Sequence, residues 1–336
     1  MKILEAWGID KVNFFYQRFS NSRTKHQSIH GLFKSKILYL PITLAFIIGF
    51  IFTLPIIFFE LILNLYQEPT LFNVTLYLMV TLISVFLEFY FLFLLSFITL
   101  AYYIHHLYQI DSDIYDITQE EFVSTLVRTV MELPEKKIIK YNLNPYEYKE
   151  HKIVLLSLVY KAKVMLSNIV AKFIVKKALT RSSLRVYSAY IAAPITGIWD
   201  SMIFYKTIRE SQYKIMVRFI VLHLIQTKMK IFQKEENIQL VLFRYYYFGE
   251  YHNSLDQLLQ NIYQVKAFEY SKESYLEVGL SNLKLLSLLF AFKNGLFSSK
   301  EKTIILENKI YENVKIIRKN IRNSDMQYLK NYISQM

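Results

Sequence analysis

Two long runs of apolar residues dominate the first third of the chain. Residues 37–59, "ILYLPITLAFIIGFIFTLPIIFF", are 23 residues without a charge. After the polar link "NLYQEPT" (64–70), residues 71–104 stay apolar for 34 residues, with Glu88 as their one charged side chain. A helix needs about 20 apolar residues to cross the hydrocarbon core of a bilayer. The pattern predicts a transmembrane hairpin over 37–104, with spans at about 37–60 and 71–104.

The charges that flank these runs predict an orientation. Residues 1–36 carry seven Lys or Arg side chains against two acidic ones, whereas the link carries only Glu68. Cytoplasmic flanks of membrane helices are enriched in Lys and Arg. We therefore expect a cytoplasmic N-terminus, an external link, and a return of residues 105–336 to the cytoplasm.

Glu88 is the one carboxylate in the second run. The 34 residues of this run would form a helix about 51 Å long, which is longer than the bilayer core of about 30 Å. A span over 71–91 would place Glu88 near the inner interface, and a span over 82–104 would place it toward the outer leaflet. At mid-depth a carboxylate costs about 2.5–3.5 kcal/mol and often marks an ion or proton path. The sequence leaves open a structural, an interfacial and an ion-pathway role, with the structural role favoured.

The pattern of residues 105–336 predicts helices and no strands. Residues typical of helix caps recur in it, and it has no sustained alternation of apolar and polar positions. We expect an all-α protein: a basic N-terminal segment (1–36), the membrane hairpin (37–104), a helical cytoplasmic lobe (105–234) and a C-terminal helical lobe (235–336). The signals that predict helix starts are Thr118 with Glu121, Asn144 before Pro145, Ser182 or Ser183, Ser298 with Glu301, and Ser324.

Residues 186–205, "VYSAYIAAPITGIWDSMIFY", form a third apolar segment, with Asp200 as its one charge. Pro194 and Gly197 lie in its middle and predict a break, hence a buried apolar hairpin. The alternative is a re-entrant or interfacial element whose basic flanks rest on anionic headgroups. The residues expected to contact the membrane surface in that case are Lys176, Lys177, Arg181, Arg185, Trp199, Lys206 and Arg209.

Charge and composition narrow the classes of function. The net charge of +13 and pI near 9.4 suit anionic lipid headgroups, nucleic acid or an acidic protein. The basic residues are scattered at helical spacing, so nucleic acid is disfavoured. The chain has no cysteine, and its two closest glycines, Gly279 and Gly295, are 16 positions apart (295 − 279). P-loops, dinucleotide fingerprints and nucleophile elbows need closer glycines and are excluded, and no bound cofactor is expected.

A cation site can be suggested where the second apolar run ends. His105 and His106 are followed by Asp111 and Asp113, and imidazole and carboxylate groups both bind cations. The spacing does not fit a calcium-binding loop, because Asp116 stands at the sixth position and Phe122 at the twelfth. Helix capping or a charged collar explains these residues more simply.

Residues 285–306, "LLSLLFAFKNGLFSSKEKTIIL", resemble the helix–turn–helix signature of tellurite-resistance-B-like domains. Asn294 and Gly295 occupy the Asp-Gly turn of that family, and Glu301 falls at its acidic position. The resemblance implies an all-α domain in a bacterial membrane-associated stress system without established enzyme activity. The arrangement as a whole resembles uncharacterised bacterial membrane proteins with an N-terminal hairpin and a helical cytoplasmic domain, and we expect localisation at the bacterial inner membrane. Asn294 departs from the family's aspartate, on which a metal role would depend.

These observations favour a non-enzymatic adaptor or scaffold at the inner leaflet, which binds lipid headgroups and associates with itself or with another membrane protein. The competing hypothesis is a subunit of an oligomeric ion or proton channel that uses Glu88. An enzyme acting on lipid is a third class, but no nucleophile and base stand at a recognisable spacing.

Overall fold

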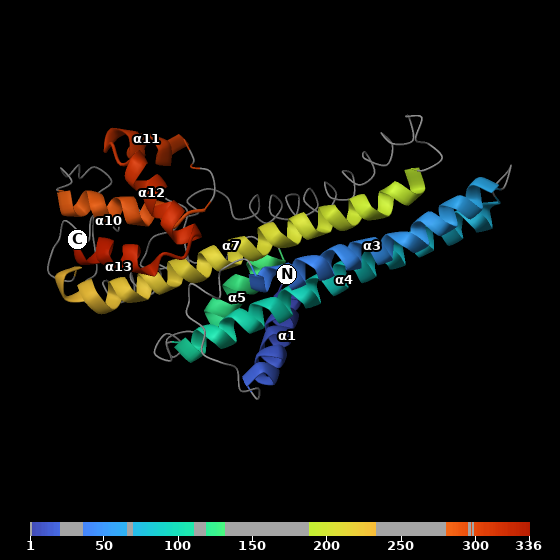
Figure 1. Cartoon of the computed structure of the whole chain (residues 1–336), viewed down its shortest axis with the longest axis horizontal. Helices are drawn as coiled ribbons and strands as arrows, with labels where there is room; N and C mark the ends of the chain where they lie inside the picture. Colours follow the sequence, from blue (N-terminus) through green and yellow to red (C-terminus); the bar gives the residue numbers. More distant parts are fainter. Residues whose placement is uncertain are drawn as a thin grey trace.

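The computed structural model describes residues 2–20, 36–65, 70–110, 119–131, 188–232, 280–294, 297 and 299–336. Every regular element within these residues is an α-helix, so the expectation of an all-α fold is confirmed for them (Figure 1). The helices are α1 (Lys2–Ser20), α3 (Lys36–Leu65), α4 (Leu71–Ile110), α5 (Gln119–Val130), α7 (Ser188–Phe232), α10 (Leu280–Ala291), α11 (Ser299–Glu307), α12 (Tyr311–Arg322) and α13 (Met326–Ser334).

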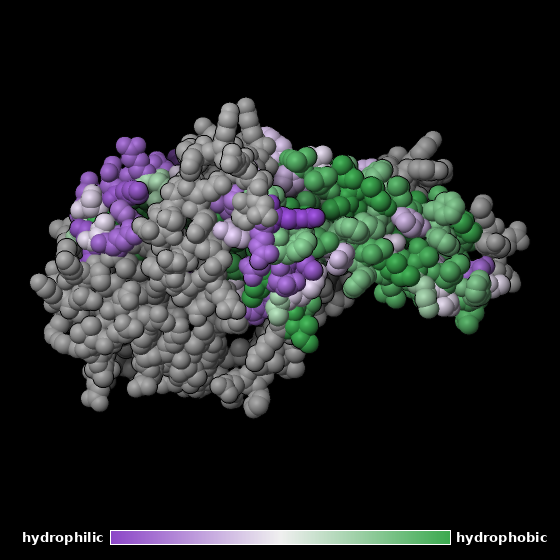
Figure 2. Space-filling model, turned by 90° about the horizontal axis from the view of Figure 1, so that it is seen from below, coloured by the Kyte–Doolittle hydropathy of each residue, from purple (hydrophilic) through white to green (hydrophobic). Residues whose placement is uncertain are grey.

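Helices α3 and α4 lie side by side and form one end of the molecule (Figure 1). Both are long and apolar enough to cross a bilayer, as the two runs predicted. Their outer surface is apolar, and Figure 2 shows hydrophobic residues gathered at this end. The exposed side chains of α3 follow helical spacing along one stripe: Leu40, Leu44, Ile47, Ile51, Leu54 and Phe58. Such a stripe on a helix surface is what contact with lipid would require.

Burial divides α4 into two parts. Between positions 71 and 91 most side chains are exposed or half-buried, and Phe72, Leu82 and Phe86 are each at least 70% exposed. Between positions 95 and 105 most side chains are buried, and Phe97 and Tyr103 are fully covered. The first part of α4 therefore presents an apolar surface outward, whereas the second part is core of the folded chain.

Helices α1 and α5 supply part of that cover. Trp7 of α1 packs edge-on against Phe97 of α4, with ring centroids 5.3 Å apart. Glu5 forms an ion pair of 2.5 Å with Arg128 of α5 and accepts a hydrogen bond from Ser124. All three polar side chains are buried. The basic N-terminal segment thus begins with a packed helix, which the sequence analysis did not anticipate.

Helix α7 corrects the prediction for the third apolar segment. It is one continuous 45-residue helix, with Pro194 inside it, so a hairpin broken near Pro194 and Gly197 is wrong. Pro194 is the seventh residue of the helix, where the missing N–H removes a single bond close to the helix start. Gly197 allows close packing, because a Cβ atom there would lie 2.7 Å from the Phe46 carbonyl oxygen of α3.

Helix α12 packs on α10, α13 and α7, and α13 also packs on α7 (Figure 1). Helix α11 adds Ile304 and Ile305 to the same buried core. Buried residues from α1, α3, α4, α5, α7 and α10–α13 join one hydrophobic core. The lobe boundary expected near 235 lies outside the described residues. Helix α7 packs both on helices before that boundary (α3, α4 and α5) and on helices after it (α12 and α13). The cap of α13 also differs from expectation by one residue: the Asp325 side chain accepts the hydrogen bond from the Tyr328 N–H, and Ser324 stands at φ 57°.

Candidate functional site

Asn294 is the centre of a polar junction between α7 and α12. Its amide donates to the carboxylate of Glu210 on α7. The side-chain oxygen of Asn294, Oδ1, accepts two hydrogen bonds from Arg322 on α12, at 3.1 Å from Nε and 3.0 Å from Nη2. Arg209 of α7 also donates to the Arg322 backbone oxygen, at 3.4 Å. The residue singled out by the family resemblance therefore has an observed structural use, as a bridge between two helices.

Two buried contacts fix the same turn. Lys293 and Glu301 form an ion pair of 2.9 Å across it, with side chains 9% and 1% exposed. Tyr213 of α7 donates to the Ala291 carbonyl oxygen at the end of α10, and burial raises the pKa of its phenol well above the usual value. Helix α11 begins at Ser299, as the Ser298 cap predicted, and Glu301 in its first turn pairs with Lys293. Gly295 and Ser298 lie outside the described residues.

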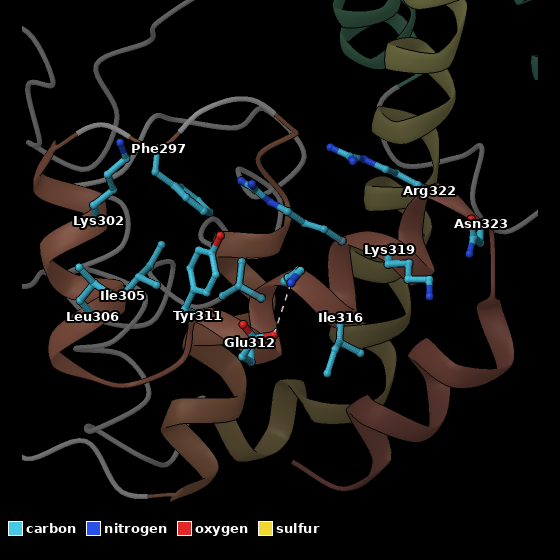
Figure 3. Close-up of a pocket in the computed structure, with 13 residues that line it drawn as sticks. Phe297, Lys302, Ile305, Leu306, Tyr311, Glu312, Ile316, Lys319, Arg322 and Asn323 are labelled. Atoms are coloured by element: carbon cyan, nitrogen blue, oxygen red, sulfur yellow. Dashed lines mark ion pairs between the residues drawn. The ribbon is translucent and has the colours of Figure 1, made fainter.

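A groove of about 760 Å³ lies beside this junction, between α11 and α12 (Figure 3). Ile305 and Val314 form its buried floor, each 1% exposed. Leu306, Tyr311 and Ile316 line it while remaining 67%, 51% and 45% exposed. We call this feature the α11–α12 groove. Exposed large apolar side chains around a hollow are typical of a binding surface.

The rim of the groove is basic. Five cationic side chains line it, against one carboxylate, that of Glu312. Glu312 lies 3.8 Å from Lys315, and both side chains are about 70% exposed, so the pair is weak. The guanidinium of Arg318 stacks 3.9 Å from the centre of the Phe297 ring. The cations are Lys302, Lys315, Arg318, Lys319 and Arg322.

Glu88 of the second apolar run and Asp200 of the third apolar segment are both covered by the folded chain. Glu88 is 3% exposed and lies on the same face of α4 as the buried Ser84 and Leu95. Asp200 is 4% exposed and lies against Gly49 of α3. Each also has a polar or electrostatic interaction within the chain. Neither carboxylate therefore faces outward from a single copy.

The residues predicted to touch the membrane surface divide into two groups. Lys176, Lys177, Arg181 and Arg185 lie outside the described residues. On α7, Lys206 is exposed, whereas Trp199 is half-buried and its indole N–H has no hydrogen-bond partner in the described part of the chain. Arg209 donates to Gln212, one turn further along α7, at 3.0 Å, and to the Arg322 backbone oxygen of the bundle at 3.4 Å.

Of the four residues suggested for a metal site, only the His105 side chain is described, and its surroundings are aromatic. His105 is buried and packs between Tyr16 and Phe19 of α1, at ring distances of 5.9 and 6.5 Å. Asp111 and Asp113 lie outside the described residues, as does the side chain of His106. Among the described residues, no group of three or more His, Asp or Glu side chains could hold a metal ion.

Comparison with models of protein families, with curated proteins and with solved structures found no match to this chain. The helix–turn–helix over 285–306 is present in its described residues, but any two helices joined by a short turn would produce it. Membership of the tellurite-resistance-B-like family remains a proposal. The groove was not predicted from the sequence. The one sequence feature that could have indicated it is Ile316, an apolar residue next to the basic residues of α12.

Proposed function

We propose that this protein is a membrane-anchored adaptor. Helix α3 and the first part of α4 hold it in the bilayer, and the α10–α13 bundle is presented at the cytoplasmic face as a binding platform. The observation that carries the proposal is the course of α7. This one helix packs on α3 near its start and on α12 and α13 near its end.

The continuity of α7 matters because a helix transmits position more rigidly than a flexible linker does. Its 45 residues extend over about 67 Å at the usual rise per residue. Its contacts with α3 fix its first part, the Asn294 junction joins its middle to α12 at Glu210, and Lys228 near its end donates to the Ser334 backbone oxygen of α13 at 3.4 Å. A bundle joined in this way to the membrane helices keeps a defined orientation toward the bilayer, which suits a platform for a partner.

The burial pattern of α4 indicates where the bilayer lies. Residues 71–91 are 21 residues, which as a helix cover about 30 Å, the thickness of the hydrocarbon core. The buried part of α4 then stands in the cytoplasm under the cover of α1 and α5. This register places Glu88 near the inner interface, where a carboxylate costs little.

The first turns of α7 also enter the bilayer in this account. Ala193 packs on Ile57 of α3, in the part of α3 that we assign to the membrane. Ile198, Met202 and Tyr205 are exposed at helical spacing, and they continue the apolar surface of α3 before Lys206, the first basic residue of α7. The start of α7 would thus be an intramembrane element packed on α3.

The orientation rests on the basic flank. The start of α1 lies beside the inner part of α4, where Trp7 contacts Tyr90 and Phe97. The bundle stands at the end of the molecule opposite the far tips of α3 and α4 (Figure 1). Both termini are then on one side, and the positive-inside rule makes that side the cytoplasm, at a bacterial inner membrane.

Proton flux separates the adaptor from the channel alternative. A pore formed by several copies needs a carboxylate that faces its neighbours, but Glu88 is covered within one copy. In reconstituted liposomes we expect no proton flux above that of empty liposomes, and no change in Glu88→Gln or in the control Glu60→Gln. A flux that depends on the protein and disappears only in Glu88→Gln would contradict the adaptor.

The molar mass of the protein in mild detergent provides an independent test. Light scattering, corrected for bound detergent, should give one copy or two. A closed ring of several copies would favour the channel instead.

A further inference from the structure

We infer that the α11–α12 groove binds an acidic amphipathic helix of a partner protein. The inference deepens the proposed adaptor function, because it names the chemistry of what the platform holds. Its first support is shape and polarity. The floor is closed by Ile305 and Val314, while Leu306, Tyr311 and Ile316 stay largely exposed beside it. An amphipathic helix covers such side chains with its own apolar face.

The second support is the position of Ile316 on α12. The buried face of this helix consists of Val314, Ile317 and Ile321, so Ile316 is not part of the face that packs into the bundle. Its side chain is 45% exposed between Lys315 and Lys319. Covering it would remove apolar surface from water, which favours binding.

Charge complementarity identifies the partner's chemistry. The groove carries five cations and one carboxylate, so a helix that brings Asp or Glu beside its apolar stripe would meet opposite charge. Arg318 is already oriented by stacking on Phe297, and Arg322 by its two hydrogen bonds to Asn294. Cations held in place lose less conformational freedom on binding than mobile ones do.

The location of the groove favours a protein over the lipid surface. Helices α11 and α12 lie at the end of the molecule opposite the tips of α3 and α4 (Figure 1). When α3 and α4 cross a bilayer, that end points away from it. Anionic headgroups share the charge of an acidic helix, but the anchored groove does not reach them.

A peptide titration tests the inference on the full chain in detergent micelles. The probe is a fluorescent peptide of about 18 residues with Leu at i, i+4, i+7 and i+11 and Glu or Gln elsewhere. Fluorescence anisotropy should show saturable binding that weakens as salt is raised. A peptide of the same composition in scrambled order, and one with Lys in place of Glu, should each bind at least about tenfold more weakly.

Variants assign the binding to the groove. Ile316→Asp and Lys319→Glu should each weaken the acidic peptide at least about tenfold. Ile3→Asp and Lys330→Glu are the matched controls, because both positions are exposed on other helices, and they should leave binding unchanged. Because Ile316 and Lys319 are exposed, the thermal unfolding of their variants should stay close to that of the parent chain.

A site-specific label provides a second readout. The chain has no cysteine, so Ile316→Cys can carry a single environment-sensitive fluorophore. Adding the acidic peptide should shift its emission to shorter wavelength, whereas the same label at Ile3→Cys should not respond.

Three results would overturn the inference: equal binding of the acidic and scrambled peptides, unchanged binding in Lys319→Glu, or tighter binding of anionic vesicles or an oligonucleotide at the labelled groove. Failure of the anchor is measured separately, by release of the chain from membranes in alkaline carbonate. Peptide binding with release would reject the anchor alone, and membrane retention without peptide binding would reject the groove alone.

Discussion

Asp200 of α7 lies directly against Gly49 of α3, so a Cβ atom at position 49 would overlap its Oδ2 atom. The contact occurs where α7 runs along α3, and it explains how a carboxylate in an apolar segment becomes buried. Glycine at position 49 leaves the room that the carboxylate fills. The same close approach is repeated at Gly197, which lies against Phe46.

Gly49→Ala should therefore destabilise the packing of α3 on α7, because Asp200 must move to admit the new methyl group. The expected loss is about 1–2 kcal/mol, and it should shrink in an Asp200→Ala background, since contacting residues couple by about 0.5–3 kcal/mol. Thermal unfolding in detergent measures the four members of this double-mutant cycle. Equal losses in the two backgrounds would show that the side chains do not touch.

The buried ion pair between Glu5 and Arg128 holds α1 to α5. Glu5→Gln should lower stability by about 3–5 kcal/mol, because it removes the carboxylate that pairs with the buried Arg128 charge. The exposed pair of Glu312 and Lys315 is the control, and Glu312→Gln should change stability by less than about 1 kcal/mol. Hydrogen exchange should report faster exchange in α1 for the first variant only. Equal effects of the two substitutions would contradict the docking of α1.

Asn294→Asp tests the junction and the family resemblance together. The variant restores the family's aspartate, but it places a carboxylate where the Asn294 amide donates to Glu210. We expect a loss of about 1–3 kcal/mol near neutral pH, as for a half-buried polar group that loses its hydrogen-bond partner. Replacing Glu210 by Gln in the same chain should recover most of the loss. A more stable Asn294→Asp would mean that this turn suits an acidic residue.

His223 on α7 should give the bundle a pH-dependent stability. Burial, and then the nearby Lys330, lower its pKa in the folded chain from the usual 6.5. The unfolded chain then takes up the proton first, so this contribution is complete above about pH 6.5 and is lost as the pH falls through the lowered folded-state pKa. His223→Gln should flatten the unfolding temperature against pH in that range. The same measurement on His105→Gln provides the comparison with a second histidine. An unfolding temperature that depends on pH in His223→Gln as it does in the parent chain would contradict the assignment of this pH dependence to His223.

The sequence predicted the helical class and the two apolar helices because those features depend on composition and length. It failed where a local signal has more than one structural use. Pro194 near a helix start costs one hydrogen bond and does not break α7. Gly197 permits close approach of α3 and is not a bend. Such outcomes depend on the neighbouring helix, which the local pattern does not specify.

The candidate site was predicted only in part for the same reason. The pattern around Asn294 indicated the turn between two helices, and the structure adds Glu210 and Arg322, 84 and 28 positions away in sequence. The partner of Glu301 also lies across the turn, at Lys293. The groove depends on how α11 packs on α12, which no short sequence window contains.

Cysteine labelling measures the central claim, that the apolar helices cross a membrane and hold the bundle on the inner side. The chain has no cysteine, so Glu68→Cys in the link and Lys330→Cys on the exposed face of α13 each provide one reactive position. A membrane-impermeant maleimide should label position 68 in intact bacterial cells, and position 330 only after the membrane is permeabilised. Labelling of position 330 in intact cells, or of position 68 only after permeabilisation, would contradict the account.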